Sequence, residues 1–333
     1  MIQKVQIQRL RGVNEGALEG LTPLTVLVGP NGSGKSTVLD ALLIAASPNA
    51  AEAVGRVVRR RANLDRGARW LFWRADPSNA VALRADASGR TNQCTLELRN
   101  ERSEKGRVTI VCEVVRLHGS YSVDTSKHRV YLEPSNQYEF DKGETLKQFV
   151  PEARFVAACS PDQPPLTELY SRAVEQGRKN EIDSLLRELI PGLDDLRILV
   201  DDDQPVLHLV FADYSVPVAA GGDGVVALVR LSFELAARKN GLVLMEEPEV
   251  HQHPAGLRLT ARAILTAIRR GVQVIITTHS LELVDAILAQ ALPTDLDRIS
   301  VHRLKLSDGT LKASRLAGQD VAAVRGEIQD DLR

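Results

Sequence analysis

A glycine-rich run between an apolar segment and a helical pattern constrains the fold of this chain more than any other feature. It consists of Gly29, Pro30, Asn31, Gly32, Ser33, Gly34, Lys35, Ser36 and Thr37. The preceding run, Leu24 to Val28, is short and continuously apolar, which predicts a buried strand. After the run, residues 37–46 place apolar side chains at helical spacing. The order strand, loop, helix is the context that the spacing G-x-x-x-x-G-K-[ST] requires.

This arrangement predicts a phosphate-binding loop. Its glycines allow successive backbone N–H groups to converge on a phosphate, and the following helix points its positive end at the same anion. Lys35 supplies a positive charge to the β- and γ-phosphates, and the Ser36 hydroxyl is placed to ligate Mg²⁺. The alternative is a purely structural glycine turn, which would make the match a coincidence. We therefore expect the chain to bind ATP with Mg²⁺ and to hydrolyse it.

Two adjacent acids follow a second apolar run, residues 242–245. Glu246 and Glu247 would lie at the carboxyl edge of the sheet, where ligands of such folds collect. We expect Glu246 to hold Mg²⁺ through a water and Glu247 to polarise the attacking water. Aspartate is commoner at the first position, but a water-bridged contact accommodates the longer side chain. Without the upstream loop, a solvated sheet edge would be the simpler interpretation.

A histidine follows the next apolar run, residues 272–276. His279 would lie at the end of a neighbouring parallel strand, where it can hydrogen-bond the γ-phosphate and sense its loss. Ser280 is expected to cap the helix that follows. The alternative for His279 is a purely structural role.

The composition is that of an ordinary globular protein, since 44% of the 333 residues are apolar and 26% are charged. Three cysteines without metal-type spacing, Cys94, Cys112 and Cys159, predict reduced thiols in a cytoplasmic protein. No apolar run approaches the roughly 20 residues that span a bilayer, so we expect no membrane segment. The formal net charge of −1 leaves DNA contact to a local patch.

The pattern along the chain predicts an α/β fold with a mixed or parallel sheet flanked by helices. Residues 81–132 contain several β-rich segments, which indicate an added antiparallel subdomain. Residues 166–189 carry two amphipathic stripes, which predict two packed surface helices or, alternatively, a lid or docking hairpin. Beyond 206, strands alternate with helices, as in a parallel sheet covered on both faces, and a hairpin closes the pattern.

Together these motifs resemble the ABC-type P-loop ATPases of the SMC, RecF and OLD group. The resemblance implies one ATPase head over 1–333, with lobe I over 1–150, a helical insert over 151–200 and lobe II over 201–333. Residues 2–37, with Arg11-Gly12 in the strand turn, are similar to the first strand pair and phosphate loop of that group. Residues 246–254 look like the acidic turn of the OLD subgroup, and residues 277–280 look like its switch-histidine loop.

In this group, ATP is held between two heads, and a glycine-rich signature of one contacts the γ-phosphate of the other. The residues matching that signature are Gly221, Gly222 and Gly224, although the usual preceding serine is missing. A flexible glycine loop is the alternative. The insert is too short for an SMC coiled coil, since 30 helical residues reach only about 45 Å. An OLD-type Toprim nuclease domain would not fit after the final hairpin, residues 299–315.

The resemblance implies an ATPase that forms a homodimer around ATP and controls a separately encoded effector, such as a nuclease, in DNA repair or phage defence. A second hypothesis is a scaffold that uses ATP for assembly with little turnover. A transporter ATPase subunit is less favoured, because neither a serine-containing signature nor a clear glutamine loop is evident.

An arginine-rich stretch, Arg56 to Arg74, offers a patch for DNA. It interleaves Trp70 and Trp73 with arginines, so it can engage phosphates and stack bases. The alternative is a solvated helix face or a set of internal ion pairs.

Overall fold

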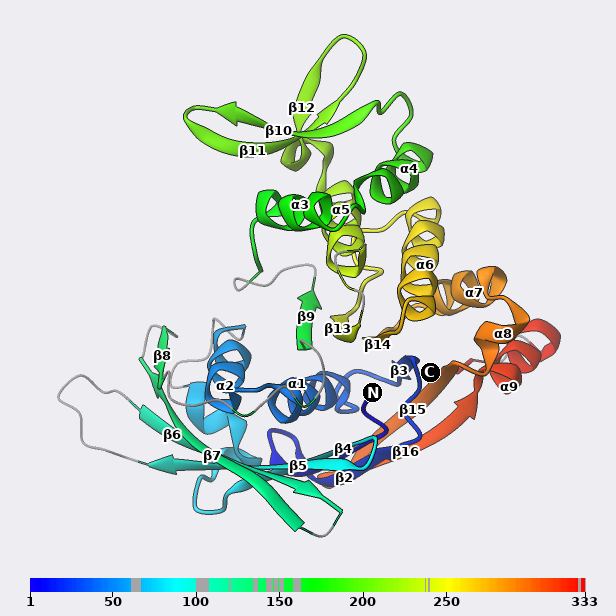
Figure 1. Cartoon of the computed structure of the whole chain (residues 1–333). Helices are drawn as coiled ribbons and strands as arrows, with labels where there is room; N and C mark the ends of the chain where they lie inside the picture. The colour runs from blue at the N-terminus through cyan, green and yellow to red at the C-terminus, as the bar shows by residue number, and fades with distance from the viewer. Residues whose placement is uncertain are drawn as a thin grey trace.

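The fold was analysed in a computed structural model. It describes residues 1–60, 67–99, 108–119, 121–133, 137–141, 146, 149, 153–157, 163–236, 238, 240–328 and 331–332. A 13-stranded mixed sheet and a three-stranded sheet organise these residues (Figure 1). Across these ranges, no helix combines the length and hydropathy needed to cross a membrane.

Five neighbouring strands at one end of the large sheet run parallel. In spatial order they are β9 (Ala153–Ala157), β13 (Gly241–Glu246), β14 (Val272–Thr277), β3 (Leu24–Val28) and β15 (Ile299–Ser307). Side chains alternate between the two faces, so Leu24 and Val26 join one hydrophobic cluster whereas Leu27 joins the other. Continuous apolar runs form these strands because both faces are buried.

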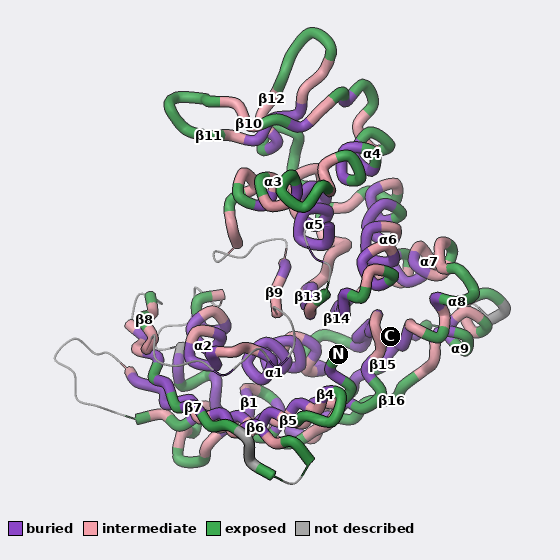
Figure 2. The backbone as a smooth tube through the Cα atoms, in the orientation of Figure 1, coloured by how far each residue is buried: buried purple, intermediate pink, exposed green. Residues whose placement is uncertain are grey.

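Helices cover both faces of this parallel part. On one side lies α1 (Lys35–Ala46), whereas the next helix, α2 (Ala50–Arg59), packs on the antiparallel part of the sheet. On the other lie α5 (Asp223–Ala236), α6 (Pro254–Arg269) and α7 (Leu281–Gln290) (Figure 1). The predicted alternation of strands and helices is thus confirmed. Figure 2 shows the buried residues concentrated in these helices and in the strands between them.

The predicted antiparallel strands are present, and they continue the same sheet because β1 pairs with both β2 and β4. From β15 outward the order is β16 (Thr310–Ala317), β2 (Val13–Glu19), β1 (Lys4–Leu10), β4 (Val81–Ala87), β5 (Arg90–Arg99), β6 (Val108–His118), β7 (Tyr121–Leu132) and β8 (Tyr138–Phe140). Helix α1 contacts β1, β4 and β5 as well as β9, β13 and β14. The sheet therefore bends around α1 (Figure 1).

The segment predicted as a helical insert contains the two expected helices, α3 (Leu166–Glu175) and α4 (Lys179–Leu189). It also contains β9 and the start of a small sheet, so the helical part is shorter than 151–200. That sheet, which we call the arm, comprises β10 (Asp195–Asp201), β11 (Gln204–Val210) and β12 (Ser215–Pro217). Its hairpin is absent from the sequence prediction because Asp202 and Asp203, rather than Asn-Gly, supply the positive φ of the turn.

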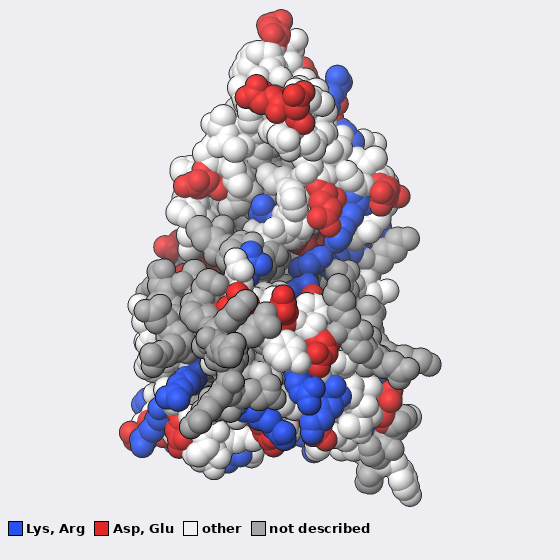
Figure 3. Space-filling model, turned by 90° about the vertical axis from the view of Figure 1, so that its left-hand side faces the viewer, with Lys and Arg blue, Asp and Glu red and all other residues white. Residues whose placement is uncertain are grey.

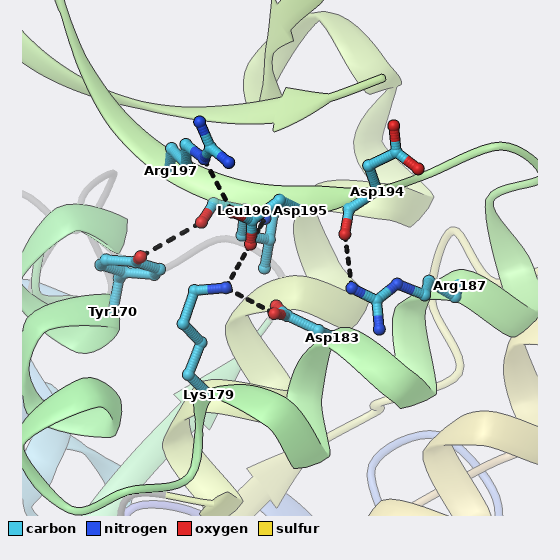
Figure 4. Close-up of polar contacts among 8 residues, drawn as sticks. All are labelled: Tyr170, Lys179, Asp183, Arg187, Asp194, Asp195, Leu196 and Arg197. Atoms are coloured by element: carbon cyan, nitrogen blue, oxygen red, sulfur yellow. Dashed lines mark hydrogen bonds and ion pairs between the residues drawn. The ribbon is translucent and has the colours of Figure 1, made fainter. Parts of the chain in front are cut away.

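Polar contacts fasten the arm to the helices below it (Figure 4). The Lys179 ammonium on α4 donates to Asp183 of the same helix, at 2.5 Å, and to Asp195 of β10. The Tyr170 hydroxyl on α3 donates to the carbonyl of Leu196 at 3.1 Å. Acidic side chains gather at the outer end of the arm, at the top of Figure 3.

Short helices and buried thiols complete the description. The helices are η1 (Gly67–Leu71), η2 (Trp73–Ala75), η3 (Val218–Gly221), α8 (Pro293–Leu296), α9 (Gly318–Ala323) and η4 (Val324–Ile328). Cys94 and Cys112 are free thiols, and burial raises the pKa of Cys94 to about 12. Cys159 lies outside the described residues.

Candidate functional site

The glycine-rich loop links the carboxyl end of β3 to the first turn of α1. Gly29, Gly32 and Gly34 have φ values of 143°, 79° and 92°, which disfavour other residues. A Cβ at Gly29 would come within 2.5 Å of the carbonyl oxygen of Leu304 on β15. Glycine is required there because the loop turns tightly against the neighbouring strand.

Lys35 lies inside this loop, with 6% of its surface exposed. Its ammonium donates to the carbonyl oxygens of Gly29, at 2.8 Å, and Pro30, at 3.1 Å. Burial lowers the pKa of Lys35, and three nearby carboxylates, those of residues 247, 249 and 246, oppose that shift. The lysine is thus a partly desolvated cation that faces acids across the loop.

The two predicted acids lie at the end of β13, opposite the end of β14. Glu247 adopts φ 47°, an uncommon conformation for a residue other than glycine. Its backbone N–H donates to the carbonyl of Thr277 at 3.0 Å, which fixes this turn. Glu247 lines the phosphate-loop pocket, whereas Glu246 lines an adjoining, largely apolar pocket beside α5. Glu247 lines both pockets, so the Glu246–Glu247 pair lies between the phosphate-loop pocket and the apolar pocket.

His279 faces Glu247, as the order of the strands predicts. The imidazole Nε2 lies 3.5 Å from Oε1 of Glu247. Ser280 caps α7, as expected, because its hydroxyl accepts the backbone N–H of Leu283 at 3.1 Å. The cap therefore fixes the backbone between His279 and the start of α7.

A third acid, Glu249, positions the histidine loop. Its Oε1 accepts the backbone N–H of His279 at 3.0 Å and the hydroxyl of Thr278 at 2.7 Å. Sequence analysis assigned no role to Glu249, because its partners lie 29 and 30 residues away. The only sequence signal is another carboxylate two residues beyond the acidic pair.

The phosphate loop, Glu247 and His279 converge on one pocket, which Glu246 and Glu249 do not line. Its lining comprises Arg11, Gly12, Asn31, Gly32, Ser33, Gly34, Lys35, Ser36, Thr37, Glu247, His279 and Leu306. They come together because β13, β14 and β3 are parallel neighbours whose carboxyl ends share one edge of the sheet.

Arg11 reaches this pocket from the β1–β2 turn, where a buried acid holds its side chain. The acid is Asp40 of α1, which is fully buried and also pairs with Arg60 at the end of α2. The Arg60 guanidinium stacks 3.3 Å from the ring centroid of Phe155 on β9. This cluster therefore connects the β1–β2 turn, which lines the pocket, to helices α1 and α2 and to strand β9.

The same contacts revise the predicted DNA patch. Only 7% of the Arg60 side chain is exposed, so its guanidinium is not available to nucleic acid. Arg56 pairs with Glu52 one helical turn away at 2.5 Å. Arg61 and Arg66 lie outside the described residues. Internal ion pairs thus account for two arginines of the stretch.

The glycines at 221–224 lie outside the phosphate-loop pocket of the same chain. Gly221 and Gly222 are exposed, and Gly222 has φ 86°. Gly224 packs on the acidic turn, since a Cβ there would come within 2.6 Å of the carbonyl oxygen of His251. The N-terminus of α5 thereby stands beside the acidic pair and faces outward.

The pocket suits the triphosphate of a nucleotide with its metal. Ser33 Oγ is buried and makes no hydrogen bond within the described residues, so it can serve an incoming phosphate. The same lining contains the ammonium of Lys35, the hydroxyl of Ser36 and the carboxylate of Glu247, which are groups of the kind that phosphates and Mg²⁺ prefer. Because Mg²⁺ keeps several waters and is shared with phosphates, it needs no larger cluster of protein ligands.

Comparison with known proteins places the chain in a family. The family described as "AAA domain, putative AbiEii toxin, Type IV TA system" matches residues 24–285. An uncharacterized protein of Methanocaldococcus jannaschii is 27% identical over 113 residues, covering 34% of this chain and 98% of that protein. The DNA double-strand break repair Rad50 ATPase of Methanopyrus kandleri is 38% identical over 79 residues. That match covers 23% of this chain and only 9% of the Rad50 protein.

Solved structures show the same fold. An SMC head bound to the C-terminal winged-helix domain of ScpA superposes with a TM-score of 0.53 and 16% identity, covering 96% of this chain and 99% of that one. A head domain of Smc with an extended coiled coil, from a complex derived from Pyrococcus furiosus, gives 0.52 and 14%, with 99% of both chains covered. The chain belongs to the AAA-domain family named above, and it has the fold of the SMC head domains.

Proposed function

We propose that this ATPase binds Mg-ATP in the phosphate loop, hydrolyses it, and closes a second copy of the chain over the nucleotide. The observation that carries the proposal is the convergence of Lys35, Glu247 and His279 on one pocket. Lys35 would leave the loop carbonyls for the β- and γ-phosphates. Ser36 and, through water, Glu246 would hold Mg²⁺, which neutralises charge on the phosphates.

Glu247 is the proposed general base. Its carboxylate would take a proton from the attacking water, while His279, 3.5 Å away, would contact the γ-phosphate. Glu249 would fix the backbone of the histidine through the 3.0 Å hydrogen bond. The exposed glycines Gly221 and Gly222, together with the half-buried Gly224, would supply backbone donors to the γ-phosphate of the second copy.

The biological role that we propose is control of a separately encoded effector, such as a nuclease, in DNA repair or phage defence. The family description mentions a toxin of a type IV toxin–antitoxin system, and the Rad50 relative is a DNA-repair ATPase. One structural neighbour is an SMC head with a winged-helix domain of another protein bound to it. These similarities support the proposal that this ATPase head acts through a partner protein.

Measured ATP turnover tests the enzymatic part. Glu247→Gln keeps the size of the side chain but removes the base, so we expect turnover to fall at least about 100-fold. Nucleotide affinity should remain near that of the wild type. Equal and negligible turnover of both chains would instead support the scaffold hypothesis, in which ATP drives assembly alone.

A further inference from the structure

A further pocket lies among helices α4, α5 and α6, which pack against one another (Figure 1). Its volume is about 710 Å³, which is within the range of small-molecule sites. None of its described lining residues belongs to the phosphate-loop pocket or to the apolar pocket that Glu246 lines. We call this separate site the three-helix pocket.

Much of the lining of the three-helix pocket is apolar. All three helices contribute buried apolar side chains, namely Ile182 and Leu185 of α4, Leu235 and Ala236 of α5, and Ala263 of α6. An apolar group that enters the pocket leaves water for these side chains, which is favourable. A ligand that fits the pocket therefore has an apolar part.

Ion pairs between α4 and the end of α6 lie at the same pocket and carry a surplus of positive charge. Arg262 pairs with Glu188 at 2.7 Å. Glu181 receives two cations, because Arg270 lies 2.7 Å from its Oε2 and Arg178 lies 3.7 Å from the same atom. Among these five side chains, three guanidinium groups face two carboxylates. The remaining positive charge favours an anionic ligand.

Two polar groups of the lining, Ser232 Oγ and Arg270 Nε, are buried and have no hydrogen-bond partner within the described residues. Ser232 is only 3% exposed, so its hydroxyl bears a desolvation cost that a ligand would relieve. The other nitrogens of the Arg270 guanidinium are engaged, Nη1 with Glu181 at 2.7 Å and Nη2 with the carbonyl of Leu235 at 3.2 Å. The guanidinium is thus held in place while its Nε–H remains to be satisfied.

We propose that the three-helix pocket binds a monocarboxylate with a short apolar chain. A carboxylate has two acceptor oxygens and no donor. One oxygen accepts from Arg270 Nε–H, and the other accepts from the Ser232 hydroxyl, which reaches it by rotation about the Cα–Cβ bond. The single negative charge balances the surplus of the ion pairs, and the chain covers the apolar side chains.

Such a ligand would connect helices that serve other parts of the molecule. Helix α4 carries Lys179, which fastens the arm, and α6 begins after the acidic turn. A carboxylate bound to Ser232 on α5 and to Arg270 at the end of α6 would hold α4 against both helices, because its chain packs on α4. The inference stands apart from the proposed nucleotide site, since no residue of that site takes part in it.

Calorimetry on the full chain with butanoate, hexanoate and octanoate tests the inference. We expect the affinity to rise about fourfold for each added methylene, which is the gain from burying one CH₂ group. Octanamide keeps the chain without the charge, so it should bind about tenfold more weakly than octanoate. Equal affinities of octanoate and octanamide would overturn the assignment of a carboxylate. Absence of binding by all three acids would overturn the site.

Two variants locate the bound acid. Ser232→Ala removes the hydroxyl without adding volume, so it should weaken octanoate about tenfold. Ser171→Ala, at an exposed serine of α3, is the matched control and should bind as the wild type does. Ala263→Leu fills part of the pocket and should abolish binding of octanoate. Wild-type affinity in both Ser232→Ala and Ala263→Leu would show that the acid binds elsewhere and would refute the inference.

Amide exchange of the wild-type chain gives a test that does not depend on how a variant folds. At an octanoate concentration about ten times the Kd, local opening of α4 should become about tenfold rarer, because opening destroys the site. Exchange in α2, which packs on the antiparallel part of the sheet, should not change. Unchanged exchange in α4 under conditions where calorimetry shows saturation would contradict binding among the three helices.

Discussion

A single buried carboxylate, that of Asp40, holds two arginines from separate parts of the chain. One of them, Arg11, lines the phosphate-loop pocket. The other, Arg60, stacks on Phe155 of the edge strand β9. The sequence gives little sign of this cluster, because Asp40 stands alone within an apolar helix. A buried charge in such a helix nevertheless demands a partner.

We expect Asp40→Asn to destabilise the fold by about 3–5 kcal/mol, because it leaves the buried guanidinium of Arg60 without its counter-charge. Urea denaturation measures the change. Glu113→Gln is the control, since Glu113 faces Lys127 in an exposed pair 3.4 Å apart and should cost under about 1 kcal/mol. Equal losses in the two variants would contradict a structural role for the buried cluster.

The placement of Lys35, Glu247 and His279 at one pocket was predictable because it needs only strand order and the rule for parallel sheets. Their chemical roles stay predictions. Glu249 was not predictable, because its contribution depends on the path of the turn after β13. The distinction is physical: strand ends are fixed by the sheet, whereas side-chain hydrogen bonds across 30 residues depend on tertiary packing.

Among the elements, those formed by long apolar runs or clear helical stripes match their predicted positions. The strands β3, β13 and β14 are examples, since burial of both faces leaves an unmistakable apolar run. The edge strand β9 and the arm strand β10 were not predicted. Both are only partly covered, so their apolar residues give a weaker pattern.

Strand β15 carries a histidine whose titration should make folding depend on pH. Burial and, secondarily, the charge of Arg315 lower the pKa of His302 from 6.5 to about 4, against a hydrogen bond at Gly20. The unfolded chain therefore binds this proton more readily, so stability is full above pH 6.5 and falls toward pH 4. A shift of this size corresponds to roughly 3 kcal/mol.

His302→Gln should flatten the decline in unfolding free energy between those pH values, as measured by urea denaturation at each pH. His118→Gln, at an exposed position in the β6–β7 hairpin, should leave the decline unchanged. The same decline in His302→Gln as in the wild type would show that other groups cause it.

The arm depends on Lys179 for its attachment. Lys179→Met removes the ammonium group that lies between Asp183 and Asp195 but keeps an unbranched apolar side chain. The nearly buried carboxylate of Asp183 then loses its ion pair with residue 179. We expect amide exchange in β10 and β11 to accelerate about tenfold, because local opening becomes easier. Lys312→Met, at an exposed site on β16, is the control. Unchanged exchange in the arm would assign its attachment to apolar packing alone.

For the whole molecule, the proposed closure over nucleotide predicts a change in mass. Glu247→Gln should trap the closed state, so light scattering with Mg-ATP should report two chains, and one chain without nucleotide. Lys35→Ala, which removes the cation for the phosphates, should remain at one chain under both conditions. A single-chain mass for Glu247→Gln at saturating Mg-ATP would exclude the two-headed site.

The two edge strands of the large sheet, β8 and β9, are short, and this bears on how the protein behaves at high concentration. Strand β8 has three residues and β9 has five, whereas the strands between them reach twelve. An edge strand presents unpaired backbone N–H and C=O groups with which another strand can pair, and a short edge strand presents few of them. At the β8 end, however, β8 pairs only with Val130, Tyr131 and Leu132 of β7, so within the described residues most of β7 forms the open edge of the sheet, and we expect association at high concentration to begin there.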